Sequence, residues 1–323
     1  MKKRILSVII YLADIIFIPF TLIASVWFKI IRKYNITYTN TISPFSKFIF
    51  KKIGVFPITN HYYEPLFDDS KILKSLRSDR NLPGVNFNIE TQLNLLTQFN
   101  YNSELIESSK LANSNPIFSF SKEQFGSGDA EILYNIVRNK KPNKIIEIGC
   151  GQSTLIIQNA IDCNNNLNPD YECEHICIEP YEFLGLENLK VNLIRKKVEE
   201  LSIDIFTSLG ENDILFIDSS HIIRPQGDVL FEYLEILPSL KSGVIIHVHD
   251  IFSPKDYLNE WKLQGVNFWD EQYLLEAFLS CNNQFEIICA VNYLKNNFYS
   301  ELQSKCPLLT PEREPGSFWF RKN

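Results

Sequence analysis

The stretch Lys144–Thr154, which reads KIIEIGCGQST, decides the fold of this 323-residue chain. Its first five residues, Lys144–Ile148, form a short run rich in Ile, which is typical of a strand buried in a parallel sheet. Gly149 and Gly151 then permit a tight turn in which the backbone approaches a ligand closely. A helix is expected to begin near Ser153, so that its N-terminus faces the same ligand. The stretch therefore predicts a strand–turn–helix unit that binds a small molecule.

The acidic residues of this unit narrow the kind of ligand. Glu147 lies inside the strand, where a buried carboxylate suits a cationic amino group and suits a pyrophosphate badly. A nicotinamide-binding loop would carry a third glycine at position 154, but Thr154 stands there. Glu179 ends the next predicted strand, 28 residues after Gly151, and an acid at that point is placed to bind the two hydroxyls of a ribose. The Asn-rich segment Asp162–Tyr171 accounts for the long spacing.

Short apolar runs alternate with amphipathic segments from here to the C-terminus. The predicted strands are Lys144–Ile148, Ile176–Ile178, Val191–Ile194, Ile214–Ile217, Val244–Val248, Phe285–Val291 and Ser317–Phe320. Segments between them have helical spacing, as at Thr154–Ala160, Asp228–Leu237 and Glu271–Leu279. This alternation predicts an α/β fold, with a parallel sheet covered by helices on both faces. Ligands of such sheets bind at the carboxyl ends of the strands, so the polar residues that follow each strand are the candidate site.

Four motifs together resemble the class I S-adenosylmethionine-dependent methyltransferases, and in particular the branch with D-x-x-H after the fourth strand and H-D after the fifth. They occur in the expected order within residues 125–321: Glu147–Gly151, Glu179, Phe216–His221 and Gly243–Asp250. The resemblance implies a Rossmann-like methyltransferase fold, a seven-stranded and mostly parallel sheet whose last strand is reversed. It also implies a set of S-adenosylmethionine-binding residues: Glu147, Gly149, Cys150, Gly151, Ser153, Glu179 and Asp218.

Methyl transfer to a hydroxyl requires a base or a metal ion that helps to remove the hydroxyl proton. His221 follows the predicted fourth strand and His249 and Asp250 close the fifth, so we expect these three catalytic residues to lie close together. The set Asp218, His249 and Asp250 could bind a divalent cation such as Mg²⁺, in which case the histidine of the D-x-x-H motif acts as general base. A purely cofactor-binding Asp218 and metal-free catalysis are the alternatives. His247 alternates with His249 along the strand and is expected to be structural.

Two further groups of residues are open to more than one interpretation. Cys173, His175 and Cys177 alternate along the second predicted strand, where small buried residues are a simpler interpretation than a zinc site. An odd total of seven cysteines in a long chain likewise indicates reduced thiols rather than a disulfide framework. After the fifth strand, Ile251–Tyr273 is rich in aromatic and acidic residues, which suit a sugar ring and suit ordinary packing equally well.

The N-terminal segment has a different composition. Residues 1–52 hold nine Lys or Arg against one acid, Asp14, a net charge of +8, and the other 271 residues carry −14, which together make −6. Ile5–Phe28 is almost wholly apolar, and as a helix it reaches about 36 Å, enough to cross a hydrocarbon core of about 30 Å. One spanning helix kinked at Pro19 is the first interpretation, and a re-entrant hairpin with both ends cytosolic is the alternative. Basic residues at both ends leave the orientation open.

These features predict four segments along the chain. They are a membrane anchor at 1–33, a basic linker at 34–60, a mostly helical, substrate-facing cap at 61–125 and a methyltransferase domain at 126–323. The linker is expected to follow an anionic membrane surface. Helical spacing occurs at Ile89–Phe99 and at Ala130–Val137, with Asp129 as the expected N-cap of the second helix.

The leading hypothesis is a membrane-anchored O-methyltransferase with its catalytic domain in the cytoplasm. It would transfer the methyl group of S-adenosylmethionine to a hydroxyl of a sugar, or of a lipid-linked glycan intermediate of surface polysaccharide. The alternatives are a hydroxylase-like enzyme on the same fold and a non-catalytic, membrane-tethered binding protein. The acidic balance of the chain argues against nucleic acid as its main partner. The identity of the acceptor and the oligomeric state are left open.

Overall fold

A computed structural model describes residues 2–37, 43–110, 118, 120, 125–181 and 185–323 of the chain. Parts of the predicted linker (38–42) and of the predicted cap (111–117, 119 and 121–124) lie outside these described residues. The chain divides into two compact units, Met1–Lys74 and Ser75–Asn323. The boundary between the two units falls inside the predicted cap, whose residues 61–74 belong to the N-terminal unit.

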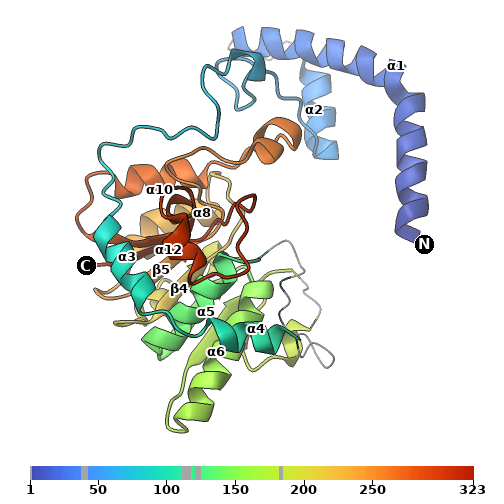
Figure 1. Cartoon of the computed structure of the whole chain (residues 1–323). Coiled ribbons are helices and arrows are strands. Elements are labelled where there is room, and N and C mark those ends of the chain that lie inside the picture. Colours follow the sequence, from blue (N-terminus) through green and yellow to red (C-terminus); the bar gives the residue numbers. More distant parts are fainter. Residues whose placement is uncertain (1, 38–42, 111–117, 119, 121–124, 182–184) are drawn as a thin grey trace. The chain divides into compact units, whose positions relative to one another are not determined.

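The N-terminal unit consists of helices α1 (Lys2–Thr37) and α2 (Pro44–Ile53), followed by the short 3-10 helix η1 (Asp69–Lys71). Figure 1 shows a bend along α1, and Pro19, the one proline inside this helix, removes a backbone hydrogen bond there. Ile5–Tyr34 has a mean hydropathy of 2.3 and is long and apolar enough to cross a membrane. A signal sequence near the N-terminus would pass the same test of length and hydropathy. The single span and the re-entrant hairpin both stay predictions.

The C-terminal unit is built on one seven-stranded sheet in the order β3-β2-β1-β4-β5-β7-β6. Its strands are β1 (Lys144–Ile148), β2 (Glu174–Ile178), β3 (Asn192–Ile194), β4 (Ile214–Ile217), β5 (Ile245–Val248), β6 (Phe285–Ala290) and β7 (Phe318–Lys322). The first five strands pair in parallel, and β7 pairs antiparallel with both β5 and β6. The predicted Rossmann-like methyltransferase fold with a reversed last strand is thereby confirmed.

Two hydrophobic cores flank this sheet. Ile145 and Phe216 point to the face covered by α5 (Asp129–Lys140) and α6 (Gln152–Leu167), whereas Ile146 and Leu215 point to the opposite face. The second face is covered by the segments α8 (Asp228–Phe231), η4 (Glu232–Ile236), α9 (Leu237–Ser239) and α10 (Glu271–Leu279). Figure 1 shows α5 and α6 on one side of the strands and α8 and α10 on the other. Successive residues of a strand face opposite sides of the sheet. A strand that is buried on both faces therefore needs apolar residues at every position, which explains the continuous apolar runs seen in the sequence.

The remaining elements are short. They are α3 (Ile89–Thr97), α4 (Asn102–Lys110), η2 (Leu186–Asn188), η3 (Val198–Glu200), α7 (Asp204–Thr207), η5 (Glu260–Gln264), α11 (Val291–Asn297) and α12 (Tyr299–Gln303). In the region predicted to be a cap, α3 packs against β6 and α4 packs against α5. These two helices therefore extend the core of the C-terminal unit.

Local predictions differ from the structure in two places. Asp129 is the first residue of α5 rather than its N-cap, and its Oδ1 accepts a hydrogen bond of 2.8 Å from the backbone N–H of Ser317. Glu131 caps the helix instead, because its Oε2 accepts the N–H of Gly128 at 2.8 Å. The Asn-rich segment Asp162–Tyr171 was predicted as an insertion, but most of it continues α6 to Leu167.

Candidate active site

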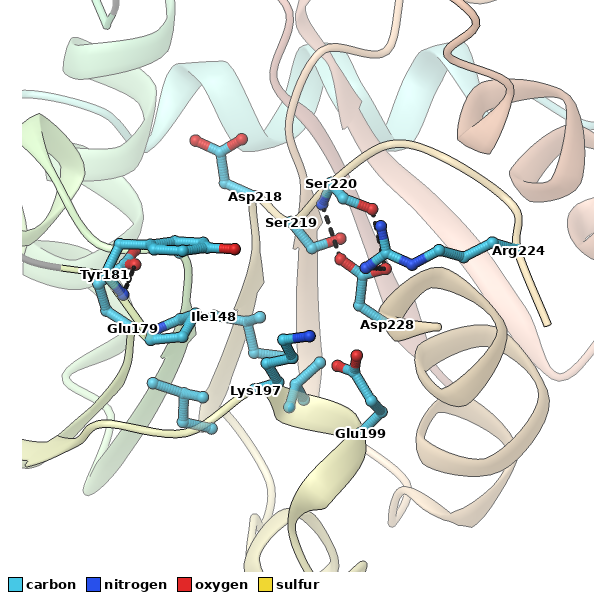
Figure 2. Close-up of a pocket in the computed structure, with 14 residues that line it drawn as sticks. Ile148, Glu179, Tyr181, Lys197, Glu199, Asp218, Ser219, Ser220, Arg224 and Asp228 are labelled. Carbon is cyan, nitrogen blue, oxygen red and sulfur yellow. Dashed lines mark hydrogen bonds and ion pairs between the residues drawn. The ribbon is translucent and has the colours of Figure 1, made fainter. Parts of the chain in front are cut away.

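An open cavity of about 220 Å³ lies at the carboxyl ends of β1 to β4. The strand order changes direction between β1 and β4, which is the position where open α/β sheets bind ligands. Its lining residues are Ile148, Gly149, Ile178, Glu179, Pro180, Tyr181, Lys197, Val198, Glu199, Asp218, Ser219, Ser220, Arg224 and Asp228. Figure 2 shows Glu179 and Tyr181 on one side of this cavity, and Ser220, Arg224 and Asp228 on the other. Of the predicted cofactor residues, Gly149, Glu179 and Asp218 line it.

The two glycines of the turn after β1 serve different purposes. Gly149 has a φ of +78°, and a Cβ at this position would lie 1.9 Å from the backbone oxygen of Asp218. The turn therefore requires glycine here on both conformational and steric grounds. At Gly151 no atom of the structure lies within 4 Å of the place a Cβ would take. Gly151 thus borders open space, which allows a ligand to approach the backbone.

Glu179 connects the end of β2 with the glycine turn. Its Oε2 accepts a hydrogen bond of 3.1 Å from the backbone N–H of Cys150, and its Oε1 accepts one of 2.8 Å from the N–H of Tyr181. The predicted ribose acid and the predicted methionine-binding turn therefore lie within the reach of one ligand molecule. Tyr181, which the sequence did not single out, adds an exposed aromatic ring to the same side of the cavity.

Glu147 is fully buried and already paired. Ser153 donates its hydroxyl to Oε1 at 2.6 Å, and Nε2 of His175 lies 3.0 Å from Oε2. Burial lowers the pKa of His175, but hydrogen bonds with Cys177 and Glu147 outweigh it and raise this pKa to about 9. Ligand atoms of Glu147, Cys150 and Cys177 lie within 4.8 Å of one another, yet the ion pair with His175 satisfies the carboxylate without a metal. Because Glu147 does not line the cavity, its contact with a cofactor stays a prediction.

A second group of side chains gathers where β4 and β5 end. Nε2 of His221 lies 3.4 Å from Oδ1 of Asp218 and 3.5 Å from Oδ2 of Asp250. Nδ1 of His249 lies 3.4 Å from Oδ1 of Asp250 and 3.7 Å from Oδ2 of Asp218. The structure therefore brings the three predicted catalytic residues together with Asp218, as the register of two neighbouring parallel strands requires.

The ligand set for a cation differs from the predicted one. Ligand atoms of Asp218, His221 and Asp250 all lie within 4.8 Å of one another, so this set, with His221 in place of His249, is the one that could hold a divalent cation. Two of these residues also have an uncommon backbone conformation, because His221 and Asp250 have φ values of +60° and +59°. The left-handed region is uncommon for residues other than glycine and occurs often at functional sites.

Glu271, at the start of α10, completes this cluster and was not predicted from the sequence. It is fully buried, and its Oε2 lies 2.8 Å from Nδ1 of His221, while Oε1 accepts the hydroxyl of Tyr233 at 3.1 Å. The backbone oxygen of His221 in turn accepts the N–H groups of Asp270 and Glu271. In the sequence, Glu271 is an ordinary acidic residue in the first turn of an amphipathic helix. Only its burial and its distance to His221 reveal its importance.

The charges of this cluster are shifted by its surroundings. Burial lowers the pKa of His221, but Asp218 and Glu271, together with Asp250, raise it well above its ordinary value. Burial raises the pKa of Asp250, and His249 and His221 compensate only in part. The pKa of His249 is also raised, because Asp250 and Asp218 outweigh the effect of burial. The carboxylates around the two histidines therefore stabilise the imidazolium form of each.

A second cavity, of about 590 Å³, touches this cluster through His249 and Asp250. Its lining residues are Asp129, His249, Asp250, Leu258, Glu260, Trp261, Thr310, Glu312, Arg313, Glu314 and Gly316. Nε2 of His249 is buried and has no hydrogen-bond partner within the described residues. Asp218 lines the first cavity, so the cluster borders both cavities.

The surrounding aromatic residues act mainly in packing. His247 is fully buried, stacks on Phe216 and lies 3.1 Å from the hydroxyl of Ser317, which agrees with the predicted structural role. In the segment after β5, Trp261 and Trp269 pack edge to face with ring centroids 5.0 Å apart. Packing therefore explains most of this segment, and Trp261 also lines the second cavity.

Comparison with known proteins gives the class of this domain. Residues 146–251, which run from β1 to just beyond β5, match the family model described as a methyltransferase domain. The chain therefore carries a methyltransferase domain and is an enzyme of that class. It is also similar to an uncharacterized protein of Archaeoglobus fulgidus, with 29% identity over 179 residues that cover 51% of this chain and 78% of that protein. Its structure resembles that of the O-methyltransferase from Bacillus cereus in complex with SAH, with 11% identity, a TM-score of 0.36 and coverage of 69% of this chain and 90% of that one.

Proposed function

We propose that this chain is an S-adenosylmethionine-dependent O-methyltransferase whose acceptor binds in the second cavity. The observation that carries the proposal is that the Asp218–His221–His249–Asp250 cluster borders two cavities, the first through Asp218 and the second through His249 and Asp250. Residues around the first cavity suit the methyl donor, because Gly151 leaves open space at the turn and Glu179 faces the cavity with a carboxylate suited to ribose hydroxyls. Bound S-adenosylmethionine would supply an electrophilic methyl group on a sulfonium.

In this proposal His221 is the general base. Glu271 holds Nδ1 of His221 as an N–H donor, so that Nε2 is the nitrogen that accepts a proton. The acceptor oxygen forms a bond to the methyl carbon as the carbon–sulfur bond breaks, and the hydroxyl proton passes to Nε2. The sulfur leaves as a neutral thioether. Positioning of the two reactants in line supplies much of the rate.

His249 has a different role in this proposal. Its other nitrogen already faces Asp250 and Asp218, and its ring stacks on Phe125 with a centroid distance of 4.9 Å. His249 lines the second cavity, and its buried Nε2 has no partner among the described residues, so a small shift of the ring would let a hydroxyl of the acceptor bind Nε2. His249 is therefore proposed to orient the acceptor rather than to remove its proton.

A divalent cation at Asp218, His221 and Asp250 is the second candidate for activating the hydroxyl. The close approach of their ligand atoms favours it, and carboxylate and imidazole are common ligands of such ions. The two candidates exclude each other at His221, because a ligated Nε2 cannot accept a proton. Sensitivity of turnover to chelators separates them.

The acceptor is proposed to be a sugar hydroxyl, in a lipid-linked glycan intermediate of surface polysaccharide. Support comes from the apolar helix α1, which would hold the enzyme at a membrane, and from Trp261 and the carboxylates of the second cavity. Aromatic rings stack on the C–H faces of sugars, and carboxylates accept their hydroxyls. The C-terminal unit is then cytoplasmic.

The test is methyl transfer by the full-length chain from labelled S-adenosylmethionine to membrane glycolipid extracts. His221→Ala should bind the labelled donor as the unaltered chain does and should lose transfer. His61→Ala is the matched control, because His61 is exposed and belongs to the N-terminal unit. Failure of the unaltered chain to bind the donor would refute the proposal in favour of a non-catalytic protein. Turnover that needs iron and oxygen instead would favour the hydroxylase-like alternative.

A further inference from the structure

Helix α2 exposes an apolar face to its surroundings. None of its ten residues is buried, and Phe45, Phe48, Ile49 and Ile53 have exposed fractions of 83%, 66%, 50% and 69%. Their positions i, i+3, i+4 and i+8 put all four side chains on one face of the helix. Such a face is costly in water and indicates an apolar partner.

The charge of the same segment is positive. Lys51 and Lys52 are exposed in the last turn of α2, and no Asp or Glu occurs between Ser43 and Tyr63. Lys52 lies within the apolar face, where a long side chain can extend its ammonium toward an anionic group while its methylenes stay among apolar neighbours. A partner that is apolar beneath and negatively charged on its surface satisfies both features.

The place where α2 docks on α1 agrees with such a partner. Phe50 of α2 packs edge to face on Phe28 of α1, with centroids 5.2 Å apart, and three residues further along α1 Ile31 is only 5% exposed. Protein packing against α1 therefore begins at Phe28, and the long apolar stretch before it is exposed. Measured along its bent path, the stretch Ile5–Trp27 is about 35 Å long, comparable with a hydrocarbon core of about 30 Å. Helix α2 thus meets α1 just beyond the end of this exposed apolar stretch.

Further contacts hold this arrangement together. Arg32 of α1 forms an ion pair with Glu64, and its guanidinium lies 4.9 Å from the ring centroid of Phe56. Phe56 also packs edge to face on Phe50 at 6.0 Å. The end of α1, the middle of α2 and the chain that follows α2 therefore form one small cluster, which leaves the opposite face of α2 uncovered.

We propose that α2 is an interfacial helix that binds the anionic lipid surface of the bilayer from which α1 emerges. Its four apolar side chains enter the boundary between headgroups and acyl chains, and Lys51 and Lys52 contact lipid phosphates. The proposal rests on the anchoring of the chain by α1. It adds a second, composition-sensitive contact that holds the segment after α1 flat on the membrane.

Spin-label accessibility in lipid nanodiscs tests the proposal on the full chain. A nitroxide is placed at Phe48→Cys in a Cys281→Ser background, because Cys281 is the exposed native cysteine among the described residues. In discs with anionic phosphatidylglycerol, the label should be more accessible to dissolved oxygen than to a water-soluble nickel chelate. A label at Leu73→Cys, a side chain that is 97% exposed in the same unit, should show the reverse order.

Two comparisons decide the outcome. A label at Ile16→Cys reports on α1 itself. If the Ile16 label is in lipid and the Phe48 label is in water, the proposal for α2 is overturned but the anchoring by α1 is not. If both labels are in water, the anchoring is overturned as well. Lys51→Glu with Lys52→Glu should move the Phe48 label toward water in anionic discs. Equal lipid exposure in purely zwitterionic discs would overturn the anionic requirement. Spin–spin coupling between copies in doubly loaded discs would show a second chain, not lipid, as the partner.

Discussion

Replacing Glu271 with Gln tests whether this buried carboxylate sets the charge of His221. Oε2 of Glu271 lies 2.8 Å from Nδ1 of His221, on a side chain with no solvent exposure. A hydrogen bond to a charged group contributes about 1.5–3 kcal/mol, which corresponds to about one to two pKa units. Because the carboxylate stabilises the imidazolium, Glu271→Gln should lower the pKa of His221 by about this amount.

The assay is the pH profile of kcat/KM. His221 acts as a base only when neutral, so the rate should rise as the pH increases through its pKa. In Glu271→Gln that rise should occur about one to two pH units lower, with a reduced plateau because the imidazole is a weaker base. Glu276→Gln is the matched control, since Glu276 is a buried carboxylate on the same helix that pairs with Arg80 instead. An unshifted profile in Glu271→Gln, or an equal shift in both variants, would refute this reasoning.

Three further outcomes are expected. Gly149→Ala should lower the free energy of unfolding in urea by at least about 1–3 kcal/mol, because φ is positive at this position and the new Cβ would collide with the backbone oxygen of Asp218. Gly151→Ala should keep the stability and weaken donor binding. The opposite pattern would contradict these roles. Because the folded pKa of His175 is about 9 against an ordinary 6.5, its pair with Glu147 should contribute up to about 3 kcal/mol below pH 6.5 and lose this as the pH rises through 9. Urea titrations of the unaltered chain and of His175→Gln should therefore converge at high pH, and a constant difference would count against the pair. Turnover should persist after dialysis against EDTA, and a loss that Mg²⁺ restores would favour the cation instead.

The sheet was predictable because its strands are buried on both faces. A run such as Lys144–Ile148 has no polar alternation and ends in a glycine turn, and this combination is characteristic of the first strand of an α/β unit. Strand ends moved by up to two residues, as at Glu174–Ile178 and Phe318–Lys322, because pairing with neighbours extends a strand beyond its apolar run. Helices α3 and α4 of the predicted cap pack against β6 and α5, which are distant in the chain, and helical spacing alone does not identify such partners.

The candidate site was predictable only in part. Side chains that directly follow β4 and β5 had to be neighbours once the sheet was parallel, so His221, His249 and Asp250 could be grouped from the sequence. The partners that determine their chemistry could not be found in this way. Glu271 is 50 residues from His221 along the chain and is brought beside it only by the packing of α10.

Taken alone, the amino-acid sequence determined the sheet, its order of motifs, the glycine turn and the long apolar helix, because each depends on local periodicity or on residues close in the chain. Tertiary structure decided which polar groups are free. It paired Glu147 with His175, left Nε2 of His249 without a partner among the described residues and brought Nε2 of His221 to 3.5 Å from Oδ2 of Asp250. These choices depend on burial and on distances between remote segments, and those are properties of the packed chain rather than of any one stretch of it.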